Sequence, residues 1–138
     1  MEVKRSSLVL VHLVNWYPLA TKVKDPILKY IKTYEPRVYQ LLQEGIGSGI
    51  IIDYGDFYQS ENGEVSPELK ERLKQDKKNG YDIVLAGGYW ARCLKNAFMG
   101  MKDLDPKMIL RGIFGQFSKP SLEELARSYG EERIITRF

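Results

Sequence analysis

The sequence predicts one α/β domain, residues 1–138, arranged as a three-layer sandwich around an open, mostly parallel sheet of about five strands. Apolar runs of strand length alternate with segments of helical periodicity along the chain. The runs at 7–15 and 83–86 are almost continuously apolar, which is typical of strands covered on both faces. A length of 138 residues also suits a single domain with a moderate core.

The first quarter of the chain predicts a strand and a helix. Residues 7–15 form the strand, and Asp25-Pro26 predicts the helix start, with aspartate as the cap and proline at the first helical position. Pro36 is expected to break or kink the helix, because proline lacks an N–H donor and crowds the preceding turn. The apolar residues of 38–42 then predict a second helical segment.

Gly45 is expected to end that second segment. The glycine-rich stretch 45–49 predicts a flexible connection; the alternative, a phosphate-binding loop, lacks the strand before it and the Lys-Ser/Thr pair after it. Residues 50–52 predict the second strand, with Asp53 at its carboxyl end. A long polar and aromatic loop over 54–65 follows, and loops of this kind often carry function.

The second half of the chain predicts regular alternation of helices and strands. Ser121 and Glu124 match a capping box. The predicted elements are a helix opened by Ser66-Pro67-Glu68, a strand at 83–86, a glycine turn at 87–88, a helix at 90–101, a strand at 108–114, a helix at 118–129 ended by Gly130, and a last strand at 133–138.

The composition excludes several classes of protein. A net charge of +3 is too small to indicate nucleic acid, and the charged run 70–78 fits the solvated face of a helix. One cysteine excludes an internal disulfide, and one histidine excludes a Cys/His zinc framework. No apolar run has the length of a membrane span. We therefore expect a cytoplasmic protein without cofactor that acts on a small molecule, with homo-oligomers as a further possibility.

Cys93 is the first candidate catalytic residue. It lies near the start of a predicted helix, after a turn at Gly87-Gly88 that lets the backbone approach a ligand. The N–H groups and the positive dipole end of a helix start can lower a thiol pKa and create a nucleophile. The alternative is a small core residue, because Cys93 lies on the apolar stripe with Trp90 and Ala97.

His12 and Asp53 complete a possible nucleophilic site with Cys93. In open parallel sheets ligands bind beyond the carboxyl ends of the strands, and all three residues are predicted to lie at or near such ends, with His12 before the end of its apolar run. Such a site uses histidine as the base and an acid to orient it, with backbone N–H groups at Gly87-Gly88 as an oxyanion hole. The alternatives are a neutral core histidine and an aspartate that only shapes a turn.

Three segments resemble the isochorismatase-like cysteine hydrolases. Residues 11–16 (VHLVNW) resemble the motif of the first strand, and 86–94 (AGGYWARCL) resemble the nucleophile motif, with glycine and cysteine six residues apart. Residues 51–57 (IIDYGDF) resemble the strand that ends in the family's lysine. The resemblance implies an α/β fold, a site at Cys93, and hydrolysis of a C–N or ester bond. It departs at two triad positions, because His12 and Asp53 stand where the family has aspartate and lysine.

The leading hypothesis is thus a divergent hydrolase of a small molecule with a cysteine nucleophile. One alternative is a non-catalytic module that binds a ligand or associates with itself. Another is a Mg²⁺ site formed by the acids of the 54–65 loop and Asp53, although their spacing matches no EF-hand. The residues expected to bind substrate, by chain proximity and aromatic or cationic character, are Gly87, Gly88, Tyr89, Trp90, Arg92 and Phe57.

Overall fold

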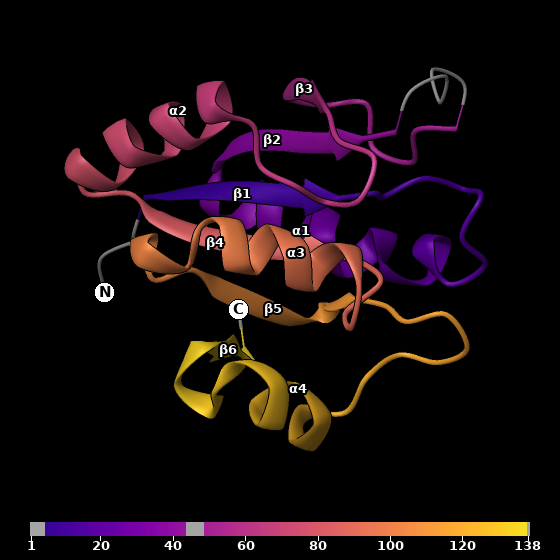
Figure 1. The fold of residues 1–138 in the computed structure, drawn as a ribbon. Helices are drawn as coiled ribbons and strands as arrows, with labels where there is room; N and C mark the ends of the chain where they lie inside the picture. Colours follow the sequence, from indigo (N-terminus) through magenta and orange to yellow (C-terminus); the bar gives the residue numbers. More distant parts are fainter. Residues whose placement is uncertain (1–4, 44–48, 138) are drawn as a thin grey trace.

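The computed structural model describes residues 5–43 and 49–137. Within these ranges six parallel strands form one open sheet in the order β3-β2-β1-β4-β5-β6 (Figure 1). The α/β class and the parallel sheet are confirmed, with six strands in place of about five. The strands are β1 (Ser6–Val11), β2 (Arg37–Leu42), β3 (Asp56–Gln59), β4 (Asp82–Gly87), β5 (Lys107–Ile113) and β6 (Ile134–Ile135).

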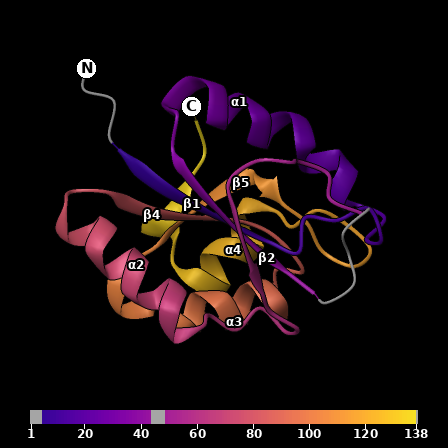
Figure 2. The same cartoon turned by 90° about the horizontal axis from the view of Figure 1, so that it is seen from above.

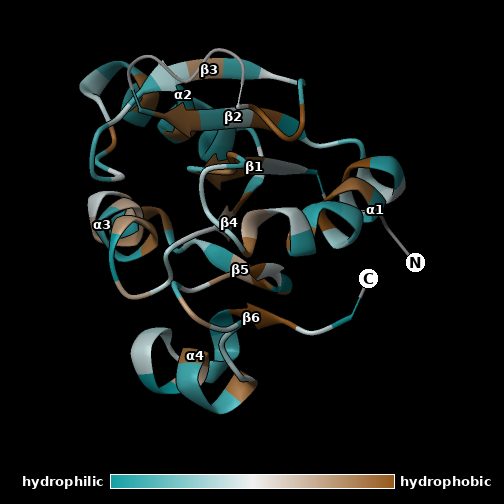
Figure 3. Ribbon diagram, turned by 90° about the vertical axis from the view of Figure 1, so that its right-hand side faces the viewer, coloured by the Kyte–Doolittle hydropathy of each residue, from teal (hydrophilic) through white to brown (hydrophobic). Residues whose placement is uncertain are grey.

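Helices cover both faces of the sheet, so the molecule has three layers. Figure 2 shows α1 on one side of the strands and α2 and α3 on the other. In Figure 3, α1 and α4 show both hydrophilic and hydrophobic segments, as expected when only one side packs on the sheet. The helices are α1 (Lys24–Tyr34), α2 (Pro67–Lys78), α3 (Cys93–Gly100) and α4 (Leu122–Tyr129), with short 3₁₀ turns at Ala20–Val23, Lys102–Leu104 and Glu131–Arg133.

The alternation of side chains along β1 divides the core in two. Val9 and Val11 belong to the cluster beneath α2, α3 and α4, whereas Leu8 and Leu10 belong to the cluster beneath α1. All four side chains are fully buried. A central strand with both faces covered therefore explains the continuous apolar run in the sequence.

The second predicted helical segment is wrong, because residues 38–42 form most of β2. A short apolar run does not distinguish a helix from a strand by periodicity alone. Here α1 ends at Tyr34, and Glu35 adopts a left-handed φ of 47° before the chain enters the sheet. The prediction for Gly45 lies outside the described residues, as does most of the predicted connection at 45–49.

The second predicted strand is also wrong. Ile50 makes only an isolated antiparallel bridge with Val14, and residues 51–52 are bends. The sheet instead takes its edge strand from the predicted loop, at β3. The buried Gln40 side chain helps to fix this course, because its amide donates to the carbonyls of Ile52 (2.6 Å) and Tyr54 (3.0 Å). This polar anchoring has no signature in hydrophobic periodicity.

The second half follows the prediction closely. The Ser66 hydroxyl caps α2 by accepting the Leu69 N–H, and Ser121 and Glu124 form the predicted capping box of α4. The strand expected at 133–138 is shorter, since only Ile134–Ile135 pairs with β5. In the part of the chain that the structure describes, no helix is long and apolar enough to cross a membrane.

Candidate functional site

The sheet changes direction between β1 and β4. From β1 the chain proceeds outward to β2 and β3, and from β4 it proceeds the opposite way to β5 and β6. A crevice forms at the carboxyl ends of the strands on either side of such a switch point. His12 follows β1 directly, and Cys93 begins α3 after β4. The fold therefore brings these two predicted residues to the same edge of the sheet.

His12 is buried and held in one orientation. Its side chain is 1% exposed, and its backbone has a left-handed φ of 50°. The Nε2–H donates to the Ser60 carbonyl oxygen at 2.8 Å, which leaves Nδ1 as an acceptor with no partner among the described residues. Burial lowers the His12 pKa, against the opposing effects of Ser60, Glu61 and Glu64. The ring is therefore a neutral imidazole with an unused lone pair near pH 7.

Cys93 is half-buried at the first position of α3. Burial and then the Glu64 carboxylate raise the pKa of the thiol. The backbone N–H groups of Tyr89 and Cys93, together with the charge of Arg92, favour the thiolate but do not outweigh them. The expectation of a lowered thiol pKa is therefore wrong for this chain, although donors do face the sulfur.

Tyr17 lies near both predicted catalytic residues. Its ring stacks nearly parallel to that of His12, with centroids 6.3 Å apart, and meets Tyr89 edge to face at 4.8 Å. Burial raises the Tyr17 pKa, and Cys93 adds to this effect, so the phenol is near the sulfur. The hydroxyl donates to Gln43 Oε1 at 3.2 Å. Sequence analysis did not select Tyr17, because it follows the strand in an irregular loop without periodicity.

The loop after β3 connects His12 with α3. Its Ser60 carbonyl holds the imidazole, and its Gly63 packs so closely that a Cβ there would lie 2.0 Å from the Cys93 carbonyl oxygen. The Asn96 amide donates to the Asn62 carbonyl at 2.8 Å. This loop therefore sets the position of the imidazole relative to the thiol.

Glu64, in the same loop, is a carboxylate near both predicted catalytic residues. Its Oε2 accepts the Asn62 N–H at 2.9 Å, and its charge acts on both His12 and Cys93. From the sequence, Glu64 was considered only as a metal ligand. Among residues 5–43 and 49–137, no group of three or more His, Cys, Asp or Glu side chains could hold a metal ion. The alternative of a Mg²⁺ site is therefore wrong for the described chain.

Asp53 does not lie where the sequence predicted. Its side chain is exposed in the segment before β3, and no described hydrogen bond or ion pair joins it to His12 or Cys93. The strand that precedes the loop ends at Gln59. Asp53 therefore lies before the strand and not at its end, and the Ser60 carbonyl makes the contact expected of an orienting acid.

Gly87 and Gly88 serve close packing. A Cβ on Gly87, whose φ is 110°, would lie 2.2 Å from the Val11 carbonyl oxygen, and one on Gly88 would lie 2.6 Å from that of Phe114. The Gly88 N–H donates to Val11 at 3.1 Å, so it is not available to an oxyanion. The Gly88–Tyr89 peptide bond is cis. The donors that face the sulfur are instead those of Tyr89 and Cys93.

The predicted substrate-binding residues separate into two places. Tyr89, Trp90 and Arg92 line a cavity of about 220 Å³ beside the start of α3, closed on its other side by residues 115–118. Phe57 lies on β3, at the far edge of the sheet, with 45% of its surface exposed. Phe57 is therefore not part of this cavity, because the segment that carries it is an edge strand and not an active-site loop.

Solved structures of other proteins share the fold of this chain. The pyrazinamidase of Pyrococcus horikoshii in complex with zinc has a TM-score of 0.68 and 12% identity, covering 98% of this chain and 99% of that chain. An isochorismatase-like hydrolase from Alkaliphilus metalliredigens has a TM-score of 0.68 and 11% identity, covering 96% and 94%. The chain has the isochorismatase-like fold.

The isochorismatase-like fold hosts more than one chemistry. The MAR1 ribonuclease of Caenorhabditis elegans also matches, with a TM-score of 0.65 and 10% identity over 99% of this chain and 78% of that chain. By sequence, no family model and no curated protein matches. The described residues do not offer the cluster that a metal such as the zinc of the pyrazinamidase structure would need. At these identities the fold alone is established, and function must be argued from the site.

Proposed function

We propose that this protein is a divergent hydrolase of a small molecule, acting on a C–N or ester bond with Cys93 as nucleophile and His12 as base. The observation that carries the proposal is the unpartnered, buried Nδ1 of His12 at the same sheet edge as Cys93. A buried nitrogen without a partner is costly unless a functional group uses it. The name of the Pyrococcus horikoshii pyrazinamidase supports an amide as the substrate class.

The chemistry assigns each proton a place. The Cys93 sulfur attacks the carbonyl carbon, and its proton passes to His12 Nδ1 as the C–S bond forms. The proton then goes to the leaving amine or alcohol as the C–N or C–O bond breaks. Water attacks the thioester, its proton returns to His12 and then to the sulfur, and the acid is released. The N–H groups of Tyr89 and Cys93 would stabilise charge on the reacting oxygen.

The high thiol pKa sets a requirement for this mechanism. Burial and Glu64 keep Cys93 protonated near neutral pH, so the thiolate would form only as the proton leaves for the base. Tyr17 stacks on the His12 ring, and its phenol is close to the sulfur. The proposal therefore includes Tyr17 as a residue that positions the imidazole.

Acyl-enzyme formation tests the proposal directly. The chain has one cysteine, so intact mass spectrometry after mixing with a panel of small activated esters and amides reports any adduct at Cys93. We expect an acyl adduct in the wild type, none in Cys93→Ala, and slower acylation in His12→Gln. Absence of both adduct and turnover across the panel would overturn the assignment.

A non-catalytic module is the second candidate, and one observation favours it. Among the described residues, no hydrogen bond joins the Cys93 sulfur to the His12 ring, and the thiol pKa is raised. In this case the cavity beside Tyr89, Trp90 and Arg92 would bind a ligand without reaction. Ligand binding would then survive Cys93→Ser unchanged. Homo-oligomers and a cytoplasmic location remain predictions, which sedimentation and fractionation would measure.

A further inference from the structure

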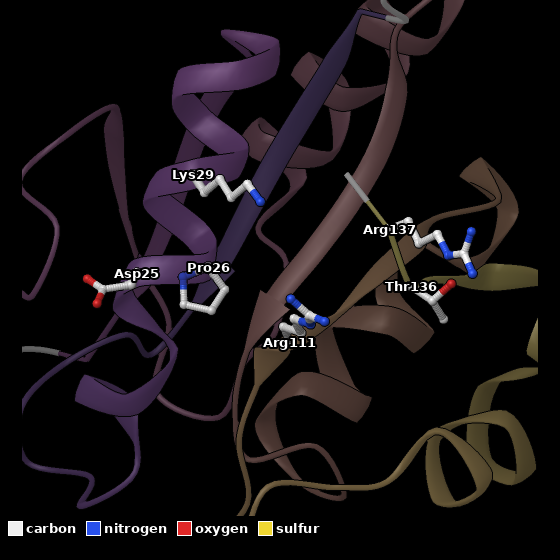
Figure 4. Close-up of a pocket in the computed structure, with 6 residues that line it drawn as sticks. All are labelled: Asp25, Pro26, Lys29, Arg111, Thr136 and Arg137. Carbon is white, nitrogen blue, oxygen red and sulfur yellow. The ribbon is translucent and has the colours of Figure 1, made fainter.

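A second hollow lies on the α1 side of the sheet, away from Cys93. It has a volume of about 360 Å³. Figure 2 places α1 and α3 on opposite faces, so this hollow is separate from the candidate active site. Figure 4 shows that three elements supply its walls: α1, β5 and the segment after β6. The lining residues are Asp25, Pro26, Lys29, Arg111, Thr136 and Arg137.

An irregularity in β5 positions Arg111 at this hollow. Leu85 of β4 pairs with Met108, but Gly87 pairs with Ile113, so β5 carries extra residues between the two pairs. Bulges of this kind redirect side chains. Gly112 packs closely there, since a Cβ on it would lie 3.1 Å from Ile27 Cγ1 of α1. The bulge is therefore pressed against α1, with Arg111 beside it.

The end of the sheet leaves the hollow open. β6 pairs with β5 only at Met108 and Ile109, and the chain then departs with Thr136 and Arg137. The hollow therefore has three walls, which are α1, the segment 136–137 and the irregular part of β5. Neither β6 nor a helix covers it among the described residues.

The charges around the hollow are mostly positive. Arg111 and Arg137 are exposed, and no described ion pair joins either of them to an acid. The Lys29 side chain extends from α1 toward the side where both arginines lie, whereas the Asp25 carboxylate points away from them (Figure 4). In Figure 4 the Arg137 guanidinium points away from Arg111, so Arg111 is the guanidinium that lies between α1 and the segment after β6. A guanidinium in such a basic hollow suits a phosphate, because its planar N–H fork binds two of the oxygens at once.

We propose that this hollow binds the phosphate group of a phosphorylated small molecule, with Arg111 as the principal contact. The ring of Pro26 and the side-chain stems of the arginines add apolar surface for the organic part of the ligand. The site does not depend on Cys93, so it is independent of the proposed hydrolysis.

Calorimetric titration with phenyl phosphate tests this proposal. We expect binding that Arg111→Gln weakens about tenfold or more, as the loss of a paired charge-assisted hydrogen bond implies. The affinity of Arg111→Lys should lie between those of the wild type and Arg111→Gln, because lysine keeps the charge and loses the planar N–H fork. The matched control is Arg127→Gln, which changes net charge equally on α4, where Arg127 pairs with Glu123. Cys93→Ala should leave the affinity unchanged.

Three results would overturn it. The first is no binding of phenyl phosphate, or equal weakening in the Arg111 and Arg127 variants. The second is tighter binding of inorganic phosphate than of phenyl phosphate, which would exclude an organic phosphate as the ligand. The third is Arg111-dependent binding of an RNA oligonucleotide without binding of phenyl phosphate. Circular dichroism melting curves of each variant would separate lost binding from lost folding.

Discussion

The imidazole of His12 and the carbonyl of Ser60 are joined by a hydrogen bond of 2.8 Å that links the end of β1 to the loop after β3. Because the bond uses Nε2–H, it fixes the tautomer and leaves Nδ1 as the acceptor. The same loop carries Glu64 and touches the Cys93 backbone. One hydrogen bond therefore helps to define the geometry of the whole site.

The lowered pKa of His12 predicts a loss of stability in mild acid. Below pH 6.5 the unfolded chain takes up a proton at His12 before the folded chain does, so the free energy of unfolding should fall as pH falls through this range. His12 is the chain's one histidine, and Glu64 and Asp103, whose pKa values are lowered, titrate below about pH 4.5. Urea unfolding between pH 7.5 and 5 measures the slope.

His12→Gln is the control for that slope. The variant should be less stable at pH 7.5 and should show a flatter pH dependence between pH 6.5 and 5. An unchanged slope in His12→Gln would mean that another group is responsible.

Removing the charge of Glu64 is predicted to make Cys93 more reactive. Glu64 is second to burial among the causes that raise the thiol pKa, so Glu64→Gln should lower that pKa. The rate of iodoacetamide alkylation as a function of pH measures it, and we expect an increase of a few-fold near pH 7.5. Glu61→Gln is the matched control, since Glu61 acts on His12 but is not among the causes at Cys93. Equal rates in wild type and Glu64→Gln would contradict the electrostatic link.

Gly63→Ala is predicted to disturb both stability and the site. The position combines a φ of 85° with a Cβ that would lie 2.0 Å from the Cys93 carbonyl oxygen. We expect a loss of more than about 2 kcal/mol and a changed alkylation rate at Cys93. Gly80→Ala separates backbone strain from steric overlap, because Gly80 has a φ of 90° but a Cβ added there would have no atom within 4 Å. That control should cost about 1 kcal/mol and leave the thiol unchanged; similar losses in both variants would argue against the contact.

Asp76 of α2 is predicted to be a main stabilising residue on the far side of the molecule from Cys93, where it bonds to the first halves of β1 and β2. Its carboxylate is 4% exposed and accepts hydrogen bonds from Ser7 (2.7 Å), Tyr39 (2.6 Å) and Arg37 (2.5 Å). Asp76→Ala leaves buried donors unsatisfied, so it should cost about 3 kcal/mol in urea unfolding. Asp103→Ala, which removes an exposed partner of Lys70, should cost less than about 1 kcal/mol. A loss at Asp76 as small as that at Asp103 would show that the buried contacts matter little.

The sequence by itself determined the α/β class, the central strands β1 and β4, and the helix starts at Ser66 and Ser121. These features depend on local chemistry, because capping side chains and continuous apolar runs act over a few residues. The sequence also directed attention to His12 and Cys93, because His12 lies on the first predicted strand and Cys93 near the start of the helix after the glycine turn.

Tertiary structure alone decided the remainder. The short run 38–42 became a strand because the sheet offered it two buried faces, and β3 formed where Gln40 anchors the preceding segment. In the folded chain Asp53 lies before β3, away from Cys93, whereas Tyr17 and Glu64 lie near Cys93. Contacts between residues far apart in the chain have no periodic signal, so only the folded structure could select which acid and which aromatic ring surround the thiol.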